Sequence, residues 1–351
     1  MKKKKYLKIF SWVFILLIWI LIFASKLTNK WLFVLTPDLE SKPGIKILDA
    51  NNPYFSVVKE SNRIYGRWKD TKITMKQMKC RMNKPRWKYI YVNAKINDNE
   101  YPLIIDTGFQ GSLLVNDLVV TDNNLELYPI TNIDSSFSGF CHIDKIQFGD
   151  IAIENPESYY RPGHYEKKIL GLTIHKQKKI GLGLRIMSLF KYILIDNVGD
   201  ELEFSMVSFS PDPNETWNQY NMRIDNSRTI PNLMVNIPIA GENTEIAFDS
   251  GYDCCLIMTE KIWEQYSKKL TKVKEKNSSV GLLSGYVDAQ EVTIDKLNMC
   301  DMTFENETID VFSNDNRFGP DFFMFGMDCF KNTAIVLDFE NNLFWVRKIT
   351  Q

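Results

Sequence analysis

From about residue 87 to the C-terminus, short apolar runs alternate with polar residues and with the turn formers Asn, Asp and Gly. Examples are KYIYVNAKI, YPLIID, KIQFGDIAIE, YILID and ELEFS. Runs that are rich in β-branched and aromatic residues and bounded by turn signals are typical of strands. The pattern therefore predicts an all-β fold for this part of the chain.

Two stretches lack this strand pattern. Residues 31–86 are mixed and polar with scattered prolines, which predicts a stalk or N-terminal extension of low definition. Residues 208–230 are again polar and predict a linker. They divide the strand-rich part into a first lobe, 87–207, and a second lobe, 231–351.

The N-terminus carries a strong apolar signal. Five lysines precede an uncharged run of 17 residues, Ile9–Ser25, and two more lysines follow it. A helix needs about 20 apolar residues to span a bilayer, so this run is at the lower limit. The leading lysines favour a cytoplasmic N-terminus. We therefore expect residues 1–30 to be a single-pass transmembrane anchor, with the rest of the chain outside the cytoplasm.

The alternative is a signal peptide that is cleaved to release a secreted protein. A basic cluster before an apolar run is common to both kinds of segment. The run here is long and rich in Trp, and no small-x-small cleavage site stands near Ala24. These features favour the anchor.

Composition excludes several partners. The chain has 351 residues, with 43 Lys plus Arg and 43 Asp plus Glu, so no net field attracts it to nucleic acid. It has three histidines, His142, His164 and His175, and no CxxC or HExxH motif. We therefore expect neither a metal site nor another cofactor.

Two segments are similar without a gap: VNAKINDNEYPLIIDTGF, from Val92, and VNIPIAGENTEIAFDSGY, from Val235. The same offset of 143 residues aligns a later glycine in each half, 77 residues after the aspartate. Each half ends in a predicted hairpin, YILIDNVGDELEFS or AIVLDFENNLFWV. The shared positions are Asp106, Thr107, Gly108 and Gly183 in the first half, and Asp249, Ser250, Gly251 and Gly326 in the second.

A repeated aspartate after an apolar strand suggests a specific chemistry. Two carboxylates brought close together cannot both ionise easily, so they share one proton. One can then act as a base on water while the other acts as an acid toward a substrate carbonyl. Thr107 and Ser250 can hydrogen-bond across the axis, and Gly108 and Gly251 allow a tight turn with N–H groups near the carboxylates.

These residues resemble the aspartic peptidases of the pepsin and retropepsin type. The resemblance covers about residues 87–350 and rests on DTG and DSG, each followed by an apolar-Gly element, Leu182-Gly183 or Phe325-Gly326. It implies two similar retropepsin-like β-barrel lobes related by a pseudo-twofold axis, with Asp106 and Asp249 as the catalytic dyad.

The same resemblance implies flap hairpins in SSFSGFCHIDKIQFGD and SSVGLLSGYVDAQEVTID. Within them, Gly139 with Phe140 and Gly285 with Tyr286 are the candidate substrate contacts.

The sequence departs from the family directly after each motif. Family members usually carry Ser, Thr or Ala there, whereas this chain has Phe109 and Tyr252. Without a hydroxyl donor there, the ionised carboxylate is less stabilised and its pKa is higher. We therefore expect a pH optimum less acidic than that of pepsin. Each lobe has about the size of a retropepsin subunit, which favours a monomeric catalytic part.

The sequence thus favours an aspartic endopeptidase that cuts protein or peptide substrates and meets the lipid bilayer through residues 9–25. A catalytically weak peptide-binding module of the same fold stays open, because Phe109 and Tyr252 would favour it if they crowded the site. A glycoside hydrolase is disfavoured, since its paired carboxylates would lie on unrelated loops.

The remaining candidates have structural interpretations. Asp196 and Asp338 recur near the hairpins and are expected to be strand-end residues rather than catalysts. Cys254 and Cys255 follow DSG in an apolar strand and are expected to be buried free thiols.

Overall fold

The computed structural model describes residues 31–34, 55–60, 63–68, 71–74, 77–82, 90–109, 111–129, 139–169, 172–225, 232–282, 285–313 and 319–347. The predicted transmembrane segment, 9–25, lies outside these residues. Within them, no helix is both long and apolar enough to cross a membrane.

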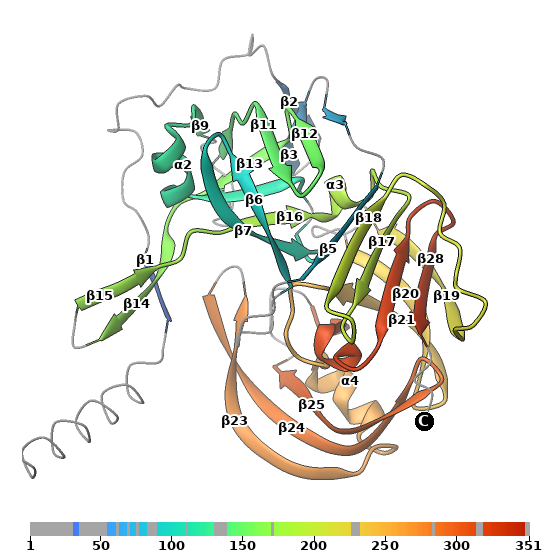
Figure 1. The fold of residues 1–351 in the computed structure, drawn as a ribbon. Coiled ribbons are helices and arrows are strands. Elements are labelled where there is room, and N and C mark those ends of the chain that lie inside the picture. Colours follow the sequence, from blue (N-terminus) through green and yellow to red (C-terminus); the bar gives the residue numbers. More distant parts are fainter. Residues whose placement is uncertain are drawn as a thin grey trace, which may run out of the picture.

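The described chain is mostly β, and its strands form two curled sheets with smaller sheets beside them (Figure 1). Ten strands make the sheet of the first lobe, which we call lobe 1. In spatial order they are β4 (Lys72–Ile73), β12 (Ile151–Glu154), β11 (Lys145–Phe148), β6 (Tyr91–Ile96), β7 (Asn99–Asp106), β16 (Ile180–Gly183), β8 (Leu113–Asn116), β13 (Ser158–Arg161), β10 (Gly139–Cys141) and β9 (Leu127–Pro129).

A second sheet of thirteen strands combines lobe 2 with a layer between the lobes. Lobe 2 contributes β23 (Lys272–Leu282), β24 (Gly285–Met299), β25 (Met302–Phe312), β22 (Leu256–Thr259), β26 (Phe323–Gly326), β21 (Glu242–Asp249) and β20 (Asn232–Ile239). The interlobe layer continues with β19 (Trp217–Asp225), β28 (Leu343–Arg347), β27 (Ala334–Asp338), β17 (Tyr192–Asp196), β18 (Glu201–Ser205) and β5 (Gln77–Arg81).

The described helices are short. They are α2 (Asp117–Asn123), α3 (Leu184–Met187), α4 (Glu260–Tyr266) and the 3₁₀ turn η1 (Met327–Phe330). Two smaller sheets complete the fold: β1 (Trp31–Val34) with β14 (His164–Ile169) and β15 (Leu172–Lys176), and β2 (Phe55–Glu60) with β3 (Arg63–Trp68).

The two predicted terminal hairpins are confirmed. Strand β17 pairs with β18 and β27 pairs with β28, each in antiparallel register. The two hairpins then join, because β17 also pairs with β27. Asp196 and Asp338 accept backbone hydrogen bonds in the two hairpin turns, from Gly199 and Asn341 respectively.

Two ranges have more structure than the sequence pattern indicates. Range 31–86, predicted as a poorly defined stalk, contains β4, which pairs with β12, and β5, which pairs with β18. Range 208–230, predicted as a linker, contains β19, which pairs with β28 and β20. Both strands do alternate locally, with Tyr220, Met222 and Ile224 in β19 and Met78 and Cys80 in β5, but the polar composition of the two ranges hides this pattern.

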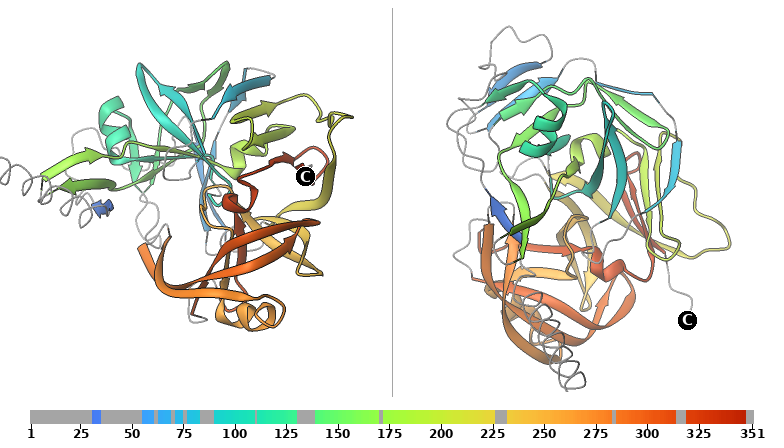
Figure 2. Two further views of the ribbon diagram at one scale, coloured as in Figure 1. Left: turned by 60° about the horizontal axis from the view of Figure 1, so that its bottom comes forward. Right: turned by 60° about the vertical axis from the view of Figure 1, so that its left-hand side comes forward.

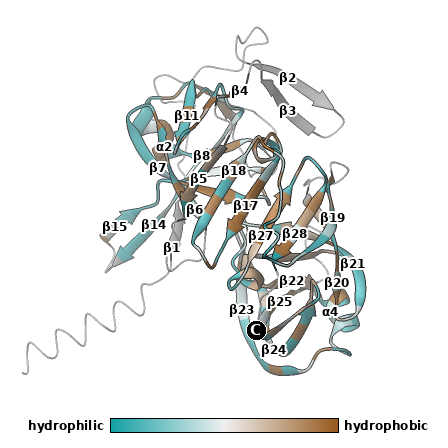
Figure 3. Ribbon diagram, turned by 45° about the vertical axis from the view of Figure 1, so that its right-hand side comes forward, coloured by the Kyte–Doolittle hydropathy of each residue, from teal (hydrophilic) through white to brown (hydrophobic). Residues whose placement is uncertain are grey.

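The apolar core runs without interruption from lobe 1 through the interlobe layer into lobe 2. It includes Ile105 from lobe 1, Ile193 and Leu337 from the interlobe layer, and Phe248 from lobe 2. Strands β17 and β28 are among the strongly hydrophobic strands of Figure 3. A shared core holds both aspartate-bearing strands on one rigid framework.

Candidate active site

The two aspartates end equivalent strands. Asp106 is the last residue of β7, and parallel strand β16 places Gly183 directly beside it. Asp249 is the last residue of β21, and parallel strand β26 places Gly326 beside it. In both lobes the glycine strand also pairs antiparallel with the strand that follows the aspartate loop. The 143-residue repeat of the sequence is therefore also a repeat of strand register.

Backbone hydrogen bonds fix each aspartate loop in the same way. Gly183 donates to the carbonyl of Ser112 at 2.8 Å, and Gly326 donates to that of Cys255 at 3.0 Å. Each of these glycines is required by space. A Cβ on Gly183 would lie 2.7 Å from the carbonyl oxygen of Phe109, and one on Gly326 would lie 2.5 Å from that of Cys254. No other residue fits without moving the loop.

The two loops also hold each other. The Thr107 hydroxyl donates to the carbonyl of Phe248 at 3.0 Å and accepts the Ser250 N–H at 2.8 Å. The Ser250 hydroxyl donates to the carbonyl of Ile105 at 2.9 Å and accepts the Thr107 N–H at 3.0 Å. Both side chains are almost fully buried, so four reciprocal hydrogen bonds satisfy them without water. The sequence predicts this exchange from the hydroxyl after each aspartate.

Each motif glycine faces the opposite aspartate. A Cβ on Gly108 would lie 2.5 Å from Cγ of Asp249, and one on Gly251 would lie 2.7 Å from Cγ of Asp106. Gly108 and Gly251 both donate backbone N–H groups to Oδ1 of Asp249, at 3.2 and 2.7 Å. The absence of side chains on these glycines lets the two carboxyl groups approach.

Burial raises the pKa of both carboxyl groups. Desolvation is the main cause in each case, and for Asp249 the nearby charge of Asp106 raises the pKa further, well above its usual range. For Asp106, the positive charge of Lys179 and a backbone hydrogen bond from Phe109 oppose the rise. The pair therefore titrates as a unit, and two like charges this close favour a state in which the carboxyl groups share one proton.

Sequence reasoning missed Lys179, which lies one residue before β16. Burial lowers the pKa of its ammonium to about 8, although the charge of Asp106 opposes that shift. Only one sequence signal could have indicated this residue: a lysine that leads directly into the apolar-Gly element at Gly183.

The structure corrects the prediction that Cys254 and Cys255 are both free thiols. Cys255 forms a disulfide with Cys329 of η1, whereas Cys254 stays a buried free thiol. Both cysteines lie in the bend before β22 rather than in a strand, and only Cys255 meets Cys329 there. The free Cys254 thiol instead lies 3.2 Å from the carbonyl of Thr308.

Phe109 and Tyr252 replace the small residue found after the motif in the resembling family. The Phe109 ring is buried and packs edge-on against Tyr159, with ring centroids 5.9 Å apart. The Tyr252 hydroxyl donates to Asp310 at 2.6 Å. Both side chains thus find partners within their own lobe.

The predicted flap residues have different settings. Phe140 is fully buried against Tyr159, which contradicts its candidacy as a substrate contact. Gly139 and Phe140 belong to β10, which pairs with β9 rather than with β11, so SSFSGFCHIDKIQFGD does not form one hairpin. In lobe 2 the stretch does form a hairpin, because β23 pairs with β24, and Gly285 with Tyr286 begins the returning strand.

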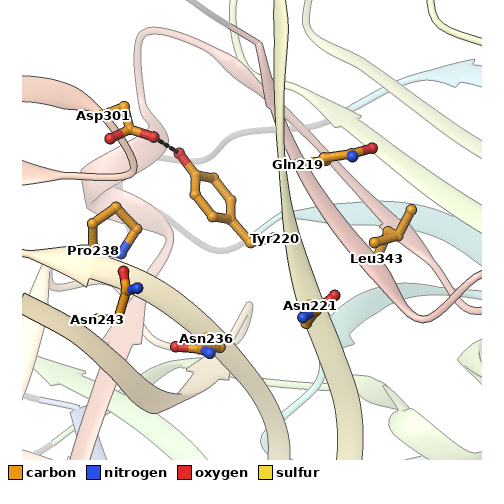
Figure 4. A pocket seen from close by; sticks show the side chains of 8 residues that line it. All are labelled: Gln219, Tyr220, Asn221, Asn236, Pro238, Asn243, Asp301 and Leu343. Atoms are coloured by element: carbon orange, nitrogen blue, oxygen red, sulfur yellow. Dashed lines mark hydrogen bonds between the residues drawn. The ribbon is translucent and has the colours of Figure 1, made fainter.

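A pocket of about 360 Å³ lies elsewhere, on lobe 2 and the interlobe layer (Figure 4). Its lining is polar and includes Tyr220, whose hydroxyl donates to Asp301 at 2.9 Å. None of its lining residues is a predicted site residue. Among the residues that the structure describes, no group of three His, Cys, Asp or Glu side chains is arranged to hold a metal ion.

Comparison with known proteins gives weak structural likenesses. No family model and no curated protein matches the chain. The aspartic proteinase from Irpex lacteus is 11% identical, with 78% of this chain and 98% of that chain covered at a TM-score of 0.46. Conglutin gamma from lupine seeds is 10% identical, with 78% and 95% covered at a TM-score of 0.43. Likenesses at this level transfer no activity, so function is inferred below from the two loops themselves.

Proposed function

We propose that the protein is an aspartic endopeptidase of the two-lobed pepsin-like type, with Asp106 and Asp249 as its catalytic dyad. The observation that carries this proposal is the reciprocal exchange of hydrogen bonds between the loops of Thr107 and Ser250. This exchange, together with two glycines that each face the opposite carboxyl group, holds two acids together in a way that a structural role does not require.

In the proposed reaction Asp106 is the base and Asp249 is the acid. Asp106 takes a proton from water as the oxygen of that water attacks the peptide carbonyl carbon. Asp249 gives its proton to the carbonyl oxygen, so that a neutral tetrahedral diol forms. Asp106 then gives its new proton to the amide nitrogen while Asp249 takes one from a hydroxyl of the diol. The C–N bond breaks, a carboxylic acid and an amine are released, and both carboxyl groups return to their starting protonation states.

We further propose that residues 9–25 anchor the chain with the dyad outside the cytoplasm and that the catalytic part is monomeric. The Cys255–Cys329 disulfide supports this location, because disulfides persist mainly in oxidising compartments. If the N-terminal segment were instead a signal peptide and were cleaved, the secreted protein would lack the anchor but carry the same site.

The test is cleavage of an unbiased peptide library by the full chain in detergent, from about pH 3 to pH 8. Asp106→Asn and Asp249→Asn should each lower the cleavage rate by about a thousandfold or more, since each removes one proton-transfer group. Asp150→Asn, in an exposed turn of lobe 1, is the matched control and should cleave normally.

Stability provides the folding control. The raised pKa of Asp249 means that the folded state loses stability as pH rises through that pKa. A neutral Asn avoids this loss, so Asp249→Asn should unfold at an equal or higher temperature at neutral pH. If the well-folded wild-type chain cuts no peptide at any pH, the peptidase proposal fails. Retention of peptides without cleavage would then favour the peptide-binding module.

A further inference from the structure

A small sheet projects from lobe 1, made of β1, β14 and β15 (Figures 1 and 2). Its outer strand, β15, is exposed at all five positions. Leu172 is 72% exposed and Ile174 is 53% exposed, and Leu172 is the most exposed large apolar side chain among the described residues. A β-bulge leaves Ile174 without a partner in β14, and we call these two exposed side chains, which lie within three residues of each other, the apolar strip.

Lysines surround this strip. Residues 164–178 contain four lysines, Lys167, Lys168, Lys176 and Lys178, and a single acidic residue, Glu166. Lys168 and Lys176 lie 3.2 and 3.5 Å from Glu166, yet their side chains are 36% and 50% exposed. Because Glu166 is itself buried, the surface of the hairpin presents mainly positive charge.

The base of the hairpin is fixed to lobe 1. His164 begins β14, and its Nδ1 lies 3.0 Å from Asp117 at the start of α2. Its Nε2 lies 3.2 Å from Glu166, and Glu166 also accepts a hydrogen bond from the Thr173 hydroxyl. These buried contacts tie both strands of the hairpin to the lobe and fix its direction.

The register of β1 gives the direction in which this strand runs along the hairpin. Val34 pairs with His164 at the base, whereas Trp31 pairs with Lys167 further toward the tip. Strand β1 therefore begins toward the tip of the hairpin and ends at its base. Five residues separate Trp31 from the end of the run Ile9–Ser25, and five extended residues span at most about 18 Å.

We propose that the β14–β15 hairpin contacts the surface of an anionic lipid bilayer, with Leu172 and Ile174 entering the interface and the surrounding lysines meeting lipid phosphates. An apolar strip flanked by lysines is the combination that binds such surfaces. This inference rests on the proposed anchoring by residues 9–25 and does not depend on peptidase activity.

The test compares two exposed apolar positions in the full chain. Leu172→Cys and, as the matched control, Val198→Cys would each carry an environment-sensitive fluorophore. Val198 is 62% exposed in the turn between β17 and β18 of the interlobe layer. Both variants also carry Cys80→Ser, because Cys80 is the only half-buried free thiol of the described residues and the other free thiols there are buried.

The chains would be placed in vesicles of phosphatidylcholine mixed with phosphatidylglycerol, some with a spin label on the acyl chain. The label should quench the probe at position 172 several-fold more than the probe at position 198. Equal quenching at the two positions, or a chain that does not float with the vesicles, overturns the proposal. The proposal is also overturned if the fluorescence at position 172 rises with protein concentration in detergent alone. That result would indicate that a second copy of the chain contacts β15.

A second arm tests the charge. Replacing Lys167, Lys168, Lys176 and Lys178 by Gln should reduce quenching at position 172 several-fold in the mixed vesicles, with little change in phosphatidylcholine alone. Unchanged quenching in the mixed vesicles overturns the role of the lysines. Cleavage of a library peptide is measured on the same samples, so a failure of the dyad and a failure of the membrane contact are seen separately.

Discussion

The two aspartate loops share their backbone hydrogen bonds but differ in the side chains that support them. In lobe 1 the Ser112 hydroxyl donates to buried Glu157, which also binds Arg185 at 2.9 Å. In lobe 2 the residue 143 positions after Ser112 is Cys255, which is held to Cys329 by the disulfide. One loop is thus supported by a charge network and the other by a covalent bond.

A second pair of equivalent positions also differs in its side-chain contacts. Next to the motif, Phe109 packs on the ring of Tyr159 in lobe 1, whereas Tyr252 donates a hydrogen bond to Asp310 in lobe 2. The register of each parallel strand pair places Tyr159 and Asp310 at equivalent positions. What the two lobes have in common is the path of the backbone, which indicates that loop geometry is the constraint and that the supporting side chains are interchangeable.

The largest effect should come from the shared backbone. Gly183→Ala places a Cβ against two carbonyl oxygens of the aspartate loop, so it should remove activity and lower the free energy of unfolding by at least about 3 kcal/mol. Gly181→Ala in the same strand is the matched control, because its Cβ would lie 3.5 Å from Cβ of Leu114, an ordinary contact. Cleavage assays and chemical denaturation measure both; similar losses in the two variants would contradict the argument.

The lobe 2 support should come next. Replacing both Cys255 and Cys329 by Ala should lower the free energy of unfolding by about 2 to 3 kcal/mol, because the cross-link restrains the unfolded chain. A reductant should lower the thermal midpoint of the wild type and leave that of the double variant unchanged. A wild type insensitive to reductant under unfolding conditions would count against a stabilising disulfide.

The lobe 1 support should have a smaller and pH-dependent effect. Arg185→Met should lower the free energy of unfolding by about 1 kcal/mol at neutral pH. The effect is small because Arg185 is half-exposed and solvent screens its charge. Burial already raises the pKa of Glu157, and losing the arginine raises it further, so the destabilisation should grow as pH rises through that pKa. Lys261→Met, in an exposed ion pair with Asp321, is the control and should change little. A pH-independent loss would refute the charge network.

The smallest effect should be a shift in the pH profile. The charge of Lys179 lowers the pKa of Asp106, and the proposed base works only when it is ionised. Lys179→Met should therefore move the acidic limb of the activity profile upward by up to about one pH unit. Lys178→Met, whose exposed ammonium pairs with Asp122, should leave that limb in place. A wild-type optimum below about pH 3 would instead contradict the expectation of a less acidic enzyme than pepsin.

The sequence by itself determined the local features of this protein. Short apolar runs with turn residues predicted a β protein, and the two terminal hairpins follow from patterns within 14 residues of chain. The repeat located both aspartates, their hydroxyl neighbours and the glycines Gly183 and Gly326, because each of these residues performs the same local task twice. Such signals are readable because backbone sterics and strand periodicity act over short distances.

Only the tertiary structure decided which distant residues meet. It paired Cys255 with Cys329, 74 residues away, placed β5 and β19 in the interlobe layer, and brought the charge of Lys179 to bear on Asp106. A thiol and a lysine look alike in many settings, and the alternation in β5 and β19 indicates a strand but not which neighbours it pairs with. These residues find their partners only when the two lobes pack around a common core. That packing depends on the whole chain and not on neighbouring residues in the sequence.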